Sequence, residues 1–375
     1  MWKNKGPLLS RLDMGLTERC NNNCIHCYIN LPANDIKAKE KELSTIEIKY
    51  ILKEAASLGC LKVRFTGGEP LLREDFEELY LFARKLGLKV FLFTNATLIT
   101  PQIAELFVRI PPLERIEISV YGMNRSSYEA VTRVPGSFEA AWRGINLLLE
   151  KKIPFVVKSA LLPPNKREMD EIEAWALNIP WMDKPPSYSM FFDLRCRQNS
   201  GNKNQLIKGL RLSPEEVLKM LTRKKAEYFR EMRDFCRKFT RPSGATIFSC
   251  GAGKGSGCVD AYGYFQLCML LRHPATVYNL KNGSLNDAIT KFSPKVRTMK
   301  ATDTEYLKHC ARCFLKGLCD QCPAKSWIEH GTLDTPVKYY CEIAHAQAEF
   351  LGLLKENEKA WGIKDWKKRI GLILS

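Results

Sequence analysis

The stretch that decides the fold is Glu18-Arg19-Cys20-Asn21-Asn22-Asn23-Cys24-Ile25-His26-Cys27-Tyr28, which places three cysteines within eight residues. We call Cys20, Cys24 and Cys27 the triad cysteines. Thiolates are soft ligands that favour zinc or iron-sulfur clusters. A structural zinc site takes four protein ligands, whereas a four-iron cluster held by three cysteines leaves one iron open to bind another molecule. The alternative is a zinc knuckle whose fourth ligand lies elsewhere, with His26 a solvated loop residue.

Length and composition are those of an ordinary globular chain. Its 375 residues suffice for one large domain and a smaller one. No apolar run has the length of a membrane span, and the first ten residues lack the apolar core of a secretory signal. Fourteen cysteines without an export signal favour metal ligands or free thiols over disulfides. We therefore expect a cytoplasmic protein with no membrane partner.

The chain is strongly basic, with a formal net charge of +17. Such a charge suits an acidic partner, for example a peptide, a ferredoxin or nucleic acid. The densest basic stretch, Arg223 to Arg241, interleaves cations with apolar residues at helical spacing. This pattern favours an amphipathic helix with a solvated basic face over a nucleic-acid surface, so we do not expect a nucleic-acid partner.

Short apolar strands alternate with helices as far as residue 194. The predicted strands are 12–16, 61–66, 88–94, 115–120, 154–159 and 188–194, with helices over 44–59, 74–87, 101–109, 137–151 and 166–177. Such alternation implies a parallel sheet covered by helices. Six units are two short of a closed eightfold barrel, so we predict an α/β fold with an open, partial (β/α)6 TIM-like barrel. Its active site should lie at the carboxyl ends of the strands, where the triad cysteines follow the first strand.

The C-x3-C-x2-C spacing, with the aromatic His26 before the third cysteine, resembles the signature of the radical S-adenosylmethionine (SAM) superfamily. The resemblance implies a [4Fe-4S] cluster whose open iron is chelated by the amino and carboxylate groups of SAM. It also implies that an electron from the reduced cluster cleaves SAM to a 5'-deoxyadenosyl radical. The cofactors expected at this site are therefore SAM and one [4Fe-4S] cluster.

Further motifs are similar to the SAM contacts of that family. Thr66-Gly67-Gly68-Glu69-Pro70 follows the second predicted strand and resembles the motif whose backbone binds the methionyl amino group. Two glycines allow a close backbone approach, and a glutamate accepts hydrogen bonds from an ammonium group. Asn95, Ser119 and Arg133 resemble the contacts to the SAM ribose and carboxylate, for which a guanidinium is well suited. The alternative for each of these three is a surface or capping role.

Eight further cysteines follow residue 245, namely Cys250, Cys258, Cys268, Cys310, Cys313, Cys319, Cys322 and Cys341. They resemble the SPASM domain, a carboxyl-terminal extension of radical SAM enzymes that holds two auxiliary [4Fe-4S] clusters. By analogy, Cys250, Cys258, Cys268 and Cys322 hold one cluster, and Cys310, Cys313, Cys319 and Cys341 hold the other. Only two residues separate Cys319 from Cys322, where the family usually has three. The competing interpretation is a pair of zinc ribbons, since C-x2-C pairs are also zinc geometry.

We therefore predict four consecutive segments and three [4Fe-4S] clusters in all. The segments are a radical SAM partial barrel (1–210), a helical linker (211–245) that begins as a long helix at Ser213-Pro214-Glu215-Glu216, a SPASM domain (246–345) and a C-terminal helical tail (346–375). Residues 260–265 are expected to form the turn of a hairpin that carries Cys268 back towards Cys250 and Cys258. Cys60, Cys196 and Cys236 are expected to be structural thiols.

The resemblance implies an oxidoreductase or maturase that abstracts hydrogen, first of all from a peptide or protein residue. A small-molecule reaction in cofactor or haem biosynthesis is the alternative. Sulfatase maturases carry an aspartate after the third auxiliary cysteine, where this chain has Met269, which disfavours that subgroup. The expected partners are a ferredoxin- or flavodoxin-type electron donor and a separate protein that binds a peptide leader. A non-enzymatic alternative is a multi-cluster electron carrier or a zinc-binding module.

Overall fold

The computed structural model describes residues 9–196 and 201–374, and its largest feature is a nine-stranded sheet. Six strands of this sheet pair in parallel in the order β1-β4-β5-β6-β7-β8. Their bounds are β1 (Arg11–Thr17), β4 (Lys62–Gly67), β5 (Lys89–Thr94), β6 (Leu113–Ser119), β7 (Phe155–Ala160) and β8 (Ser187–Ser189). The sheet has two free edges in the described part of the chain, so the predicted open parallel arrangement is confirmed.

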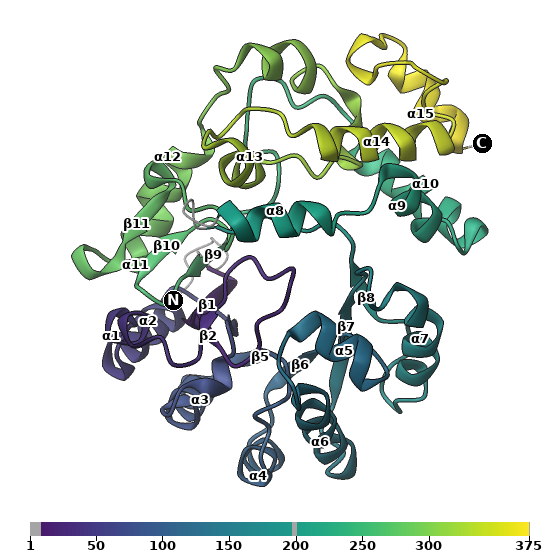
Figure 1. Ribbon diagram of the computed structural model, residues 1–375. Helices are drawn as coiled ribbons and strands as arrows, with labels where there is room; N and C mark the ends of the chain where they lie inside the picture. The colour runs from purple at the N-terminus through teal and green to yellow at the C-terminus, as the bar shows by residue number, and fades with distance from the viewer. Residues whose placement is uncertain (1–8, 197–200, 375) are drawn as a thin grey trace. The chain divides into compact units, whose positions relative to one another are not determined.

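Helices alternate with these strands and lie along one side of the sheet (Figure 1). They are α2 (Thr45–Ser57), α3 (Phe76–Lys85), α4 (Pro101–Arg109), α6 (Ser137–Glu150) and α7 (Met169–Leu177). The predicted starts are confirmed where a cap defines them. Ser44 and Glu47 form a reciprocal capping box at α2, and Thr100 accepts a hydrogen bond from Ile103 N at the start of α4.

Several elements differ from those expected. The sixth strand is only three residues long, because the chain leaves the sheet after Ser189. In the described part of the chain before residue 210, three helices were not expected: α1 (Ile36–Lys41), α5 (Arg125–Thr132) and α8 (Gly201–Gly209). The predicted long helix at Ser213 is wrong: α9 (Pro214–Leu221) has the expected capping box but ends at Thr222, and α10 (Lys225–Phe239) is a separate helix. α10 buries Tyr228 and Cys236 beneath an exposed basic face, as the amphipathic pattern indicates.

Three short strands extend the sheet beyond β1. They are β9 (Ser256–Val259), which pairs in parallel with β1, and the antiparallel strands β10 (Tyr264–Gln266) and β11 (Val277–Asn279). The predicted hairpin turn is confirmed between β9 and β10. Asp260 accepts hydrogen bonds from the backbone of Tyr262 and Tyr264, both at 3.0 Å, and Gly263 adopts a φ of 89°.

The chain divides into two compact units whose segments interleave. Unit 1 comprises residues 1–210, 252–269 and 276–294, and unit 2 comprises residues 211–251, 270–275 and 295–375. The pairing of β9 with β1 explains why residues after 251 return to unit 1. The predicted boundaries at residues 210, 245 and 345 assume continuous segments, and as family domains they stay a prediction.

Unit 2 is built around its own hydrophobic cluster. This cluster joins α10 to the carboxyl-terminal part of the chain through buried Tyr228, Phe314, Ala348 and Leu353. The helices here are α13 (Pro323–His330), α14 (Lys338–Phe350) and α15 (Trp366–Leu374). The described ranges of the whole chain, most of them in unit 1, also contain β2 (Arg19–Cys20), β3 (Leu31–Pro32), α1 (Ile36–Lys41), α11 (Leu285–Asp287), α12 (Ser293–Arg297) and eight short 3-10 or π segments. Within the described ranges, each helix is too short or too polar to cross a membrane.

Candidate active site and cysteine centres

The triad cysteines lie in a loop that begins where β1 ends. The loop leaves through β2, which pairs with β3, so its two ends are held together. In between, Asn23 N donates to Thr132 O and Ile25 N to Val131 O, both at 2.9 Å. These two bonds satisfy carbonyls of the last turn of α5, the helix that was not expected. The loop is therefore fixed to the scaffold at the carboxyl ends of the strands, where the active site was predicted.

Cys24 is buried, Cys20 and Cys27 are half-buried, and the three thiols lie close enough to influence one another. Asn22 N donates to Cys20 Sγ and Asn30 N to Cys27 Sγ, each at 3.4 Å. Burial raises the pKa of the Cys20 thiol well above its usual value, with further contributions from Glu69 and Cys24. Burial and the neighbouring Cys27 raise the pKa of Cys24 to about 12. A metal centre that replaces the thiol protons relieves both effects, so this set of donors fits a cluster.

Gly67 and Gly68 pack against the backbone that leads into the triad cysteines. Gly68 N donates to Thr17 O at 2.7 Å, and Glu69 N donates to Arg19 O at 2.9 Å. A Cβ on Gly68 would lie 2.1 Å from Arg19 O, and Gly67 has a φ of 140°. The predicted close approach is therefore present, but the partner in these contacts is the chain's own backbone. The glycines hold the ends of β4 and β1 together at the site.

Glu69 is fully buried and binds the end of β5. Its carboxylate accepts hydrogen bonds from Thr94 Oγ1 and Asn95 N, both at 2.8 Å, and from Leu71 N at 3.1 Å. Burial raises its pKa to about 7, against the opposing effect of these bonds. Pro70 follows at the start of a 3-10 turn. Glu69 therefore already has three donors from the protein, while its predicted ammonium contact stays a prediction.

The three other predicted SAM contacts lie at different strand and helix ends. Asn95 donates from Nδ2 to Asn21 Oδ1 at 3.0 Å and to Cys20 Sγ at 3.8 Å, so it reaches the triad loop directly. Ser119 ends β6 and hydrogen-bonds to Tyr121. Arg133 is exposed in the left-handed conformation directly after α5, next to the carbonyl that holds the loop. Their contacts with SAM stay predictions.

His26 is packed between aromatic rings rather than solvated. Its ring centroid lies 5.3 Å from that of Tyr121 and 5.4 Å from that of Phe192. Burial, together with the positive charge of Lys203, lowers the pKa of His26 to about 4. The alternative in which His26 is a solvated loop residue is therefore wrong, and the residue forms part of an apolar wall beside the triad cysteines.

Two cations that donate hydrogen bonds to carbonyl groups of the triad loop were not predicted from the sequence. Arg195 donates to Cys27 O at 3.1 Å, to Asn30 Oδ1 at 2.7 Å and to Asn30 O at 2.7 Å. Lys203 Nζ donates to Cys24 O at 2.9 Å. The signal for Arg195 was its place after the last predicted strand, next to the buried Cys196. Lys203 lies on a short polar helix that carries no distinctive pattern.

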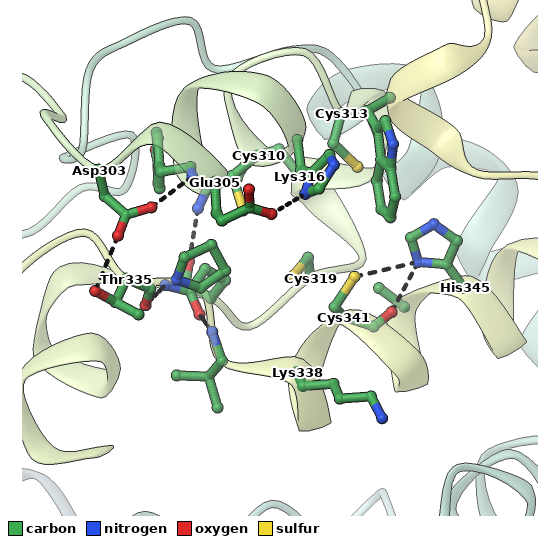
Figure 2. Close-up of a pocket in the computed structure, with 17 residues that line it drawn as sticks. Asp303, Glu305, Cys310, Cys313, Lys316, Cys319, Thr335, Lys338, Cys341 and His345 are labelled. Carbon is green, nitrogen blue, oxygen red and sulfur yellow. Dashed lines mark hydrogen bonds and ion pairs between the residues drawn. The ribbon is translucent and has the colours of Figure 1, made fainter. Parts of the chain in front are cut away.

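A second cysteine centre lies within unit 2 (Figure 2). Four cysteines line one cavity of about 350 Å3, namely Cys310, Cys313, Cys319 and Cys341. Burial is the main cause of the raised pKa of each thiol, to about 12 for Cys310 and about 11 for Cys341. This is the set predicted for the second auxiliary cluster, and Cys322 is not among the lining residues. Although only two residues separate Cys319 from Cys322, Cys319 still lines the cavity together with Cys310, Cys313 and Cys341.

The other predicted set is divided between the two units. Cys258 and Cys268 belong to unit 1 and interact electrostatically, whereas Cys250 and Cys322 belong to unit 2. Cys258 Sγ donates to Asp13 Oδ2 at 3.7 Å. Burial, and then the negative charge of Asp13, hold the pKa of Cys258 well above its usual value. A cluster held by this set stays a prediction.

No three His, Cys, Asp or Glu side chains within residues 9–196 and 201–374 meet the geometry of a site for one metal ion. A four-iron cluster is bound through one thiolate on each iron, so its ligands are spaced more widely than those that share one ion. Four thiols around a common cavity are consistent with that wider spacing.

Residues 14–176 match the model of the Radical SAM superfamily. A curated relative from Methanosarcina barkeri, named AdoMet-dependent heme synthase, is 27% identical over 332 residues, which cover 84% of this chain and 91% of the relative. AdoMet is SAM.

Two solved structures resemble almost the whole chain. They are described as native anSMEcpe with bound AdoMet and native anSMEcpe with bound AdoMet and Cp18Cys peptide, with TM-scores of 0.60 and 0.59 at 15% and 14% identity. Each comparison covers 97% of this chain and 99% of the other. At such identity the likeness concerns the fold alone. Residues 14–176 are thus a radical SAM domain.

Proposed function

We propose that this enzyme cleaves SAM reductively at the triad cysteines and abstracts a hydrogen atom from a peptide or protein residue. The observation that carries the proposal is the junction at the carboxyl ends of β1 and β4. There the triad loop, the Gly67-Gly68 pair and buried Glu69 are joined by backbone hydrogen bonds of 2.7 and 2.9 Å. When bound, the [4Fe-4S] cluster and SAM supply a 5'-deoxyadenosyl radical.

The protein's own residues give this site its shape and keep water from it. The triad cysteines hold the cluster, and backbone N–H groups of Asn22 and Asn30 stabilise the charge on its sulfur ligands. The rings of His26, Tyr121 and Phe192 form an apolar wall beside the loop. Such a wall protects a carbon radical from water and from side reactions. Asn95, Ser119 and Arg133 are proposed to orient SAM.

We further propose that Cys310, Cys313, Cys319 and Cys341 hold an auxiliary [4Fe-4S] cluster, and that Cys250, Cys258, Cys268 and Cys322 hold another. The convergence of the first four on one cavity supports the first assignment. When bound there, such a cluster would supply an acceptor for the electron that a substrate radical loses on oxidation to a closed-shell product. This role requires that the cluster's reduction potential be matched to the task.

A peptide or protein substrate is supported by the likeness in fold to a protein that was solved with a bound peptide. A second candidate is a carboxylate-bearing tetrapyrrole. The observation that favours it is the sequence similarity to an AdoMet-dependent heme synthase, which extends over 84% of the chain. Both candidates need the same radical, and they differ in the molecule that loses hydrogen.

We place the electron donor at a cavity of about 920 Å3 in unit 1. Its lining includes exposed Lys37 and Lys41 of α1, which follows β3 and hence the triad loop, together with Lys281. Arg195 adds a fourth cation to the lining, against the two carboxylates of Asp35 and Glu40, and this net positive charge attracts an acidic carrier such as a flavodoxin or ferredoxin. A separate leader-binding protein and a cytoplasmic location remain part of this proposal, and nucleic acid does not.

The proposal is tested with anaerobically reconstituted protein, dithionite and SAM. We expect 5'-deoxyadenosine to form and about twelve irons to bind per chain if all three clusters are full. Substrate is identified by incubation with deuterated candidate peptides or tetrapyrroles in ordinary buffer, because the deuterium of the true substrate moves into 5'-deoxyadenosine. A zinc-loaded protein that does not cleave SAM would instead support the binding-module alternative.

A further inference from the structure

His345 follows Cys341 by four residues in α14, so the two side chains lie on the same face of the helix. His345 also lines the cavity that the four cysteines share (Figure 2). Only 8% of the residue is exposed. Its Nδ1 is 2.8 Å from Cys341 O and 3.6 Å from Cys341 Sγ. A histidine in this position touches both the backbone and the sulfur of one proposed cluster ligand.

The partners of the ring determine which nitrogen carries the proton. Ala360 N–H donates to His345 Nε2 at 3.2 Å. A backbone amide can only donate, so Nε2 must present its lone pair. In the neutral ring the proton is then on Nδ1, and the Nδ1–H group is directed at Cys341 O and Cys341 Sγ. The hydrogen bond from Ala360 therefore fixes a donor that faces the sulfur.

The orientation of the ring is held by the segment that contains Ala360. Trp361 packs edge-on against His345, with ring centroids 5.4 Å apart. The same indole packs against His309 at 4.4 Å, and His309 Nδ1 in turn pairs with Glu305 Oε2 at 3.2 Å. The two histidines thus share an aromatic neighbour and a cavity, but the side chain of one faces a cysteine and that of the other faces a carboxylate.

We propose that His345 is a positioning residue for the auxiliary centre: its Nδ1–H donates a hydrogen bond to the Cys341 thiolate and thereby raises the reduction potential of the cluster. This inference rests on the proposed function, which places a cluster on Cys341. Reduction adds negative charge to the cluster, and a hydrogen bond to a ligating sulfur stabilises the more negative state. The segment around Ala360 affects the cluster only through His345, because the hydrogen bond from Ala360 N fixes which ring nitrogen of His345 carries the proton.

The first test measures the potential of the auxiliary centre by redox titration followed by electron paramagnetic resonance. The measurement uses a chain whose triad cysteines, Cys250 and Cys322 are replaced by alanine, so that neither the SAM-binding cluster nor the other proposed auxiliary cluster contributes. His345→Phe keeps an aromatic ring and removes the donor, and we expect the potential to shift downward. His345→Gln keeps an amide N–H, and we expect a smaller downward shift. The matched control is His330→Phe at the end of α13, which replaces an exposed histidine outside the lining of the cavity and should leave the potential unchanged.

The second test needs no iron. In cluster-free protein labelled with nitrogen-15 in its five histidines, the resonances lost in His345→Phe identify His345. We expect a protonated Nδ1 and a bare Nε2. If His345→Phe fails to fold, selective assignment through His345→Gln serves the same purpose, and the potential of that variant carries the comparison.

Two results would overturn the inference while leaving the proposed function intact. One is a protonated Nε2 in the cluster-free protein. The other is an iron-loaded His345→Phe or His345→Gln chain whose potential equals that of the parent. By contrast, a parent chain that binds no auxiliary iron would overturn the assignment of Cys341 as a ligand, and with it both proposals. Counting iron before the titration separates these cases.

Discussion

Gly68→Ala should damage the site through backbone contact alone. The new Cβ would lie 2.1 Å from Arg19 O, whereas real Cβ contacts are essentially never shorter than 3.0 Å, so the two segments must separate by about 0.9 Å. A shift of that size breaks the hydrogen bonds from Gly68 N to Thr17 O and from Glu69 N to Arg19 O, which are 2.7 and 2.9 Å long. Overpacking costs about 1–3 kcal/mol, and each lost bond about 0.5–1.5 kcal/mol.

These terms together predict that Gly68→Ala lowers the free energy of unfolding by about 2–6 kcal/mol. For a unit of this size the melting temperature should fall by roughly 4–24 °C. 5'-Deoxyadenosine formation should fall as well, because the triad loop moves with Arg19. The matched control is Gly209→Ala at the end of α8, where the new Cβ meets nothing within 4 Å. Equal melting temperatures and equal deoxyadenosine yields for the two variants would refute the reasoning.

Three further predictions concern separate parts of the chain. Replacing the triad cysteines by alanine should leave about eight of about twelve irons and abolish 5'-deoxyadenosine formation; full iron content would place the cluster elsewhere. Lys37→Glu combined with Lys41→Glu should slow reduction by flavodoxin several-fold at low salt while reduction by dithionite is unchanged; an unaltered flavodoxin rate would move the donor to another face. Hydrogen bonds from Arg369 lower the pKa of Glu358 from 4.5 to about 2, so this carboxylate adds stability that is present above pH 4.5 and lost as the pH falls towards 2. The difference in urea stability between the parent and Glu358→Gln should shrink over that window, and a constant difference would contradict the assignment.

The parallel sheet could be predicted because its signals are local. β1 is buried along almost its whole length and β4 to β7 bury alternate residues, so each strand is a short run rich in apolar residues. The helices between the strands begin at caps such as Ser44 with Glu47 or Thr100 with Pro101. α5 was missed because its eight residues, Arg125–Thr132, carry few apolar side chains, and its start at Asn124 shows only a single cap. The carbonyl groups at the end of α5, however, accept the hydrogen bonds that hold the triad loop. A helix that positions the site was therefore missed because its sequence pattern is weak.

The cysteines could be predicted, but not their surroundings. The resemblance to the SPASM domain grouped Cys310, Cys313, Cys319 and Cys341, and these four line one cavity, while their role as cluster ligands stays a prediction. Sequence spacing does not identify partners that come from distant segments, such as Lys203 on Cys24 O or Ala360 on His345. The glycine pair illustrates the same limit. The two glycines predicted a close backbone approach to a ligand, but the group that Gly68 approaches is Arg19 O of the same chain.

Asp13 bears on whether Cys258 can serve as a ligand. The two residues lie opposite each other in the pairing of β1 with β9, and the Cys258 thiol donates to the Asp13 carboxylate. A thiolate at this point would face that negative charge, which opposes ligation. The same carboxylate, however, pairs with Arg64 at 3.1 Å and with Arg11 at 3.3 Å. Two guanidinium groups and one carboxylate carry a local charge of +1, so loss of the thiol proton brings the group to neutrality instead of adding an uncompensated buried anion. The cost of ligation at Cys258 is therefore mainly the burial of the thiolate, which coordination to iron offsets.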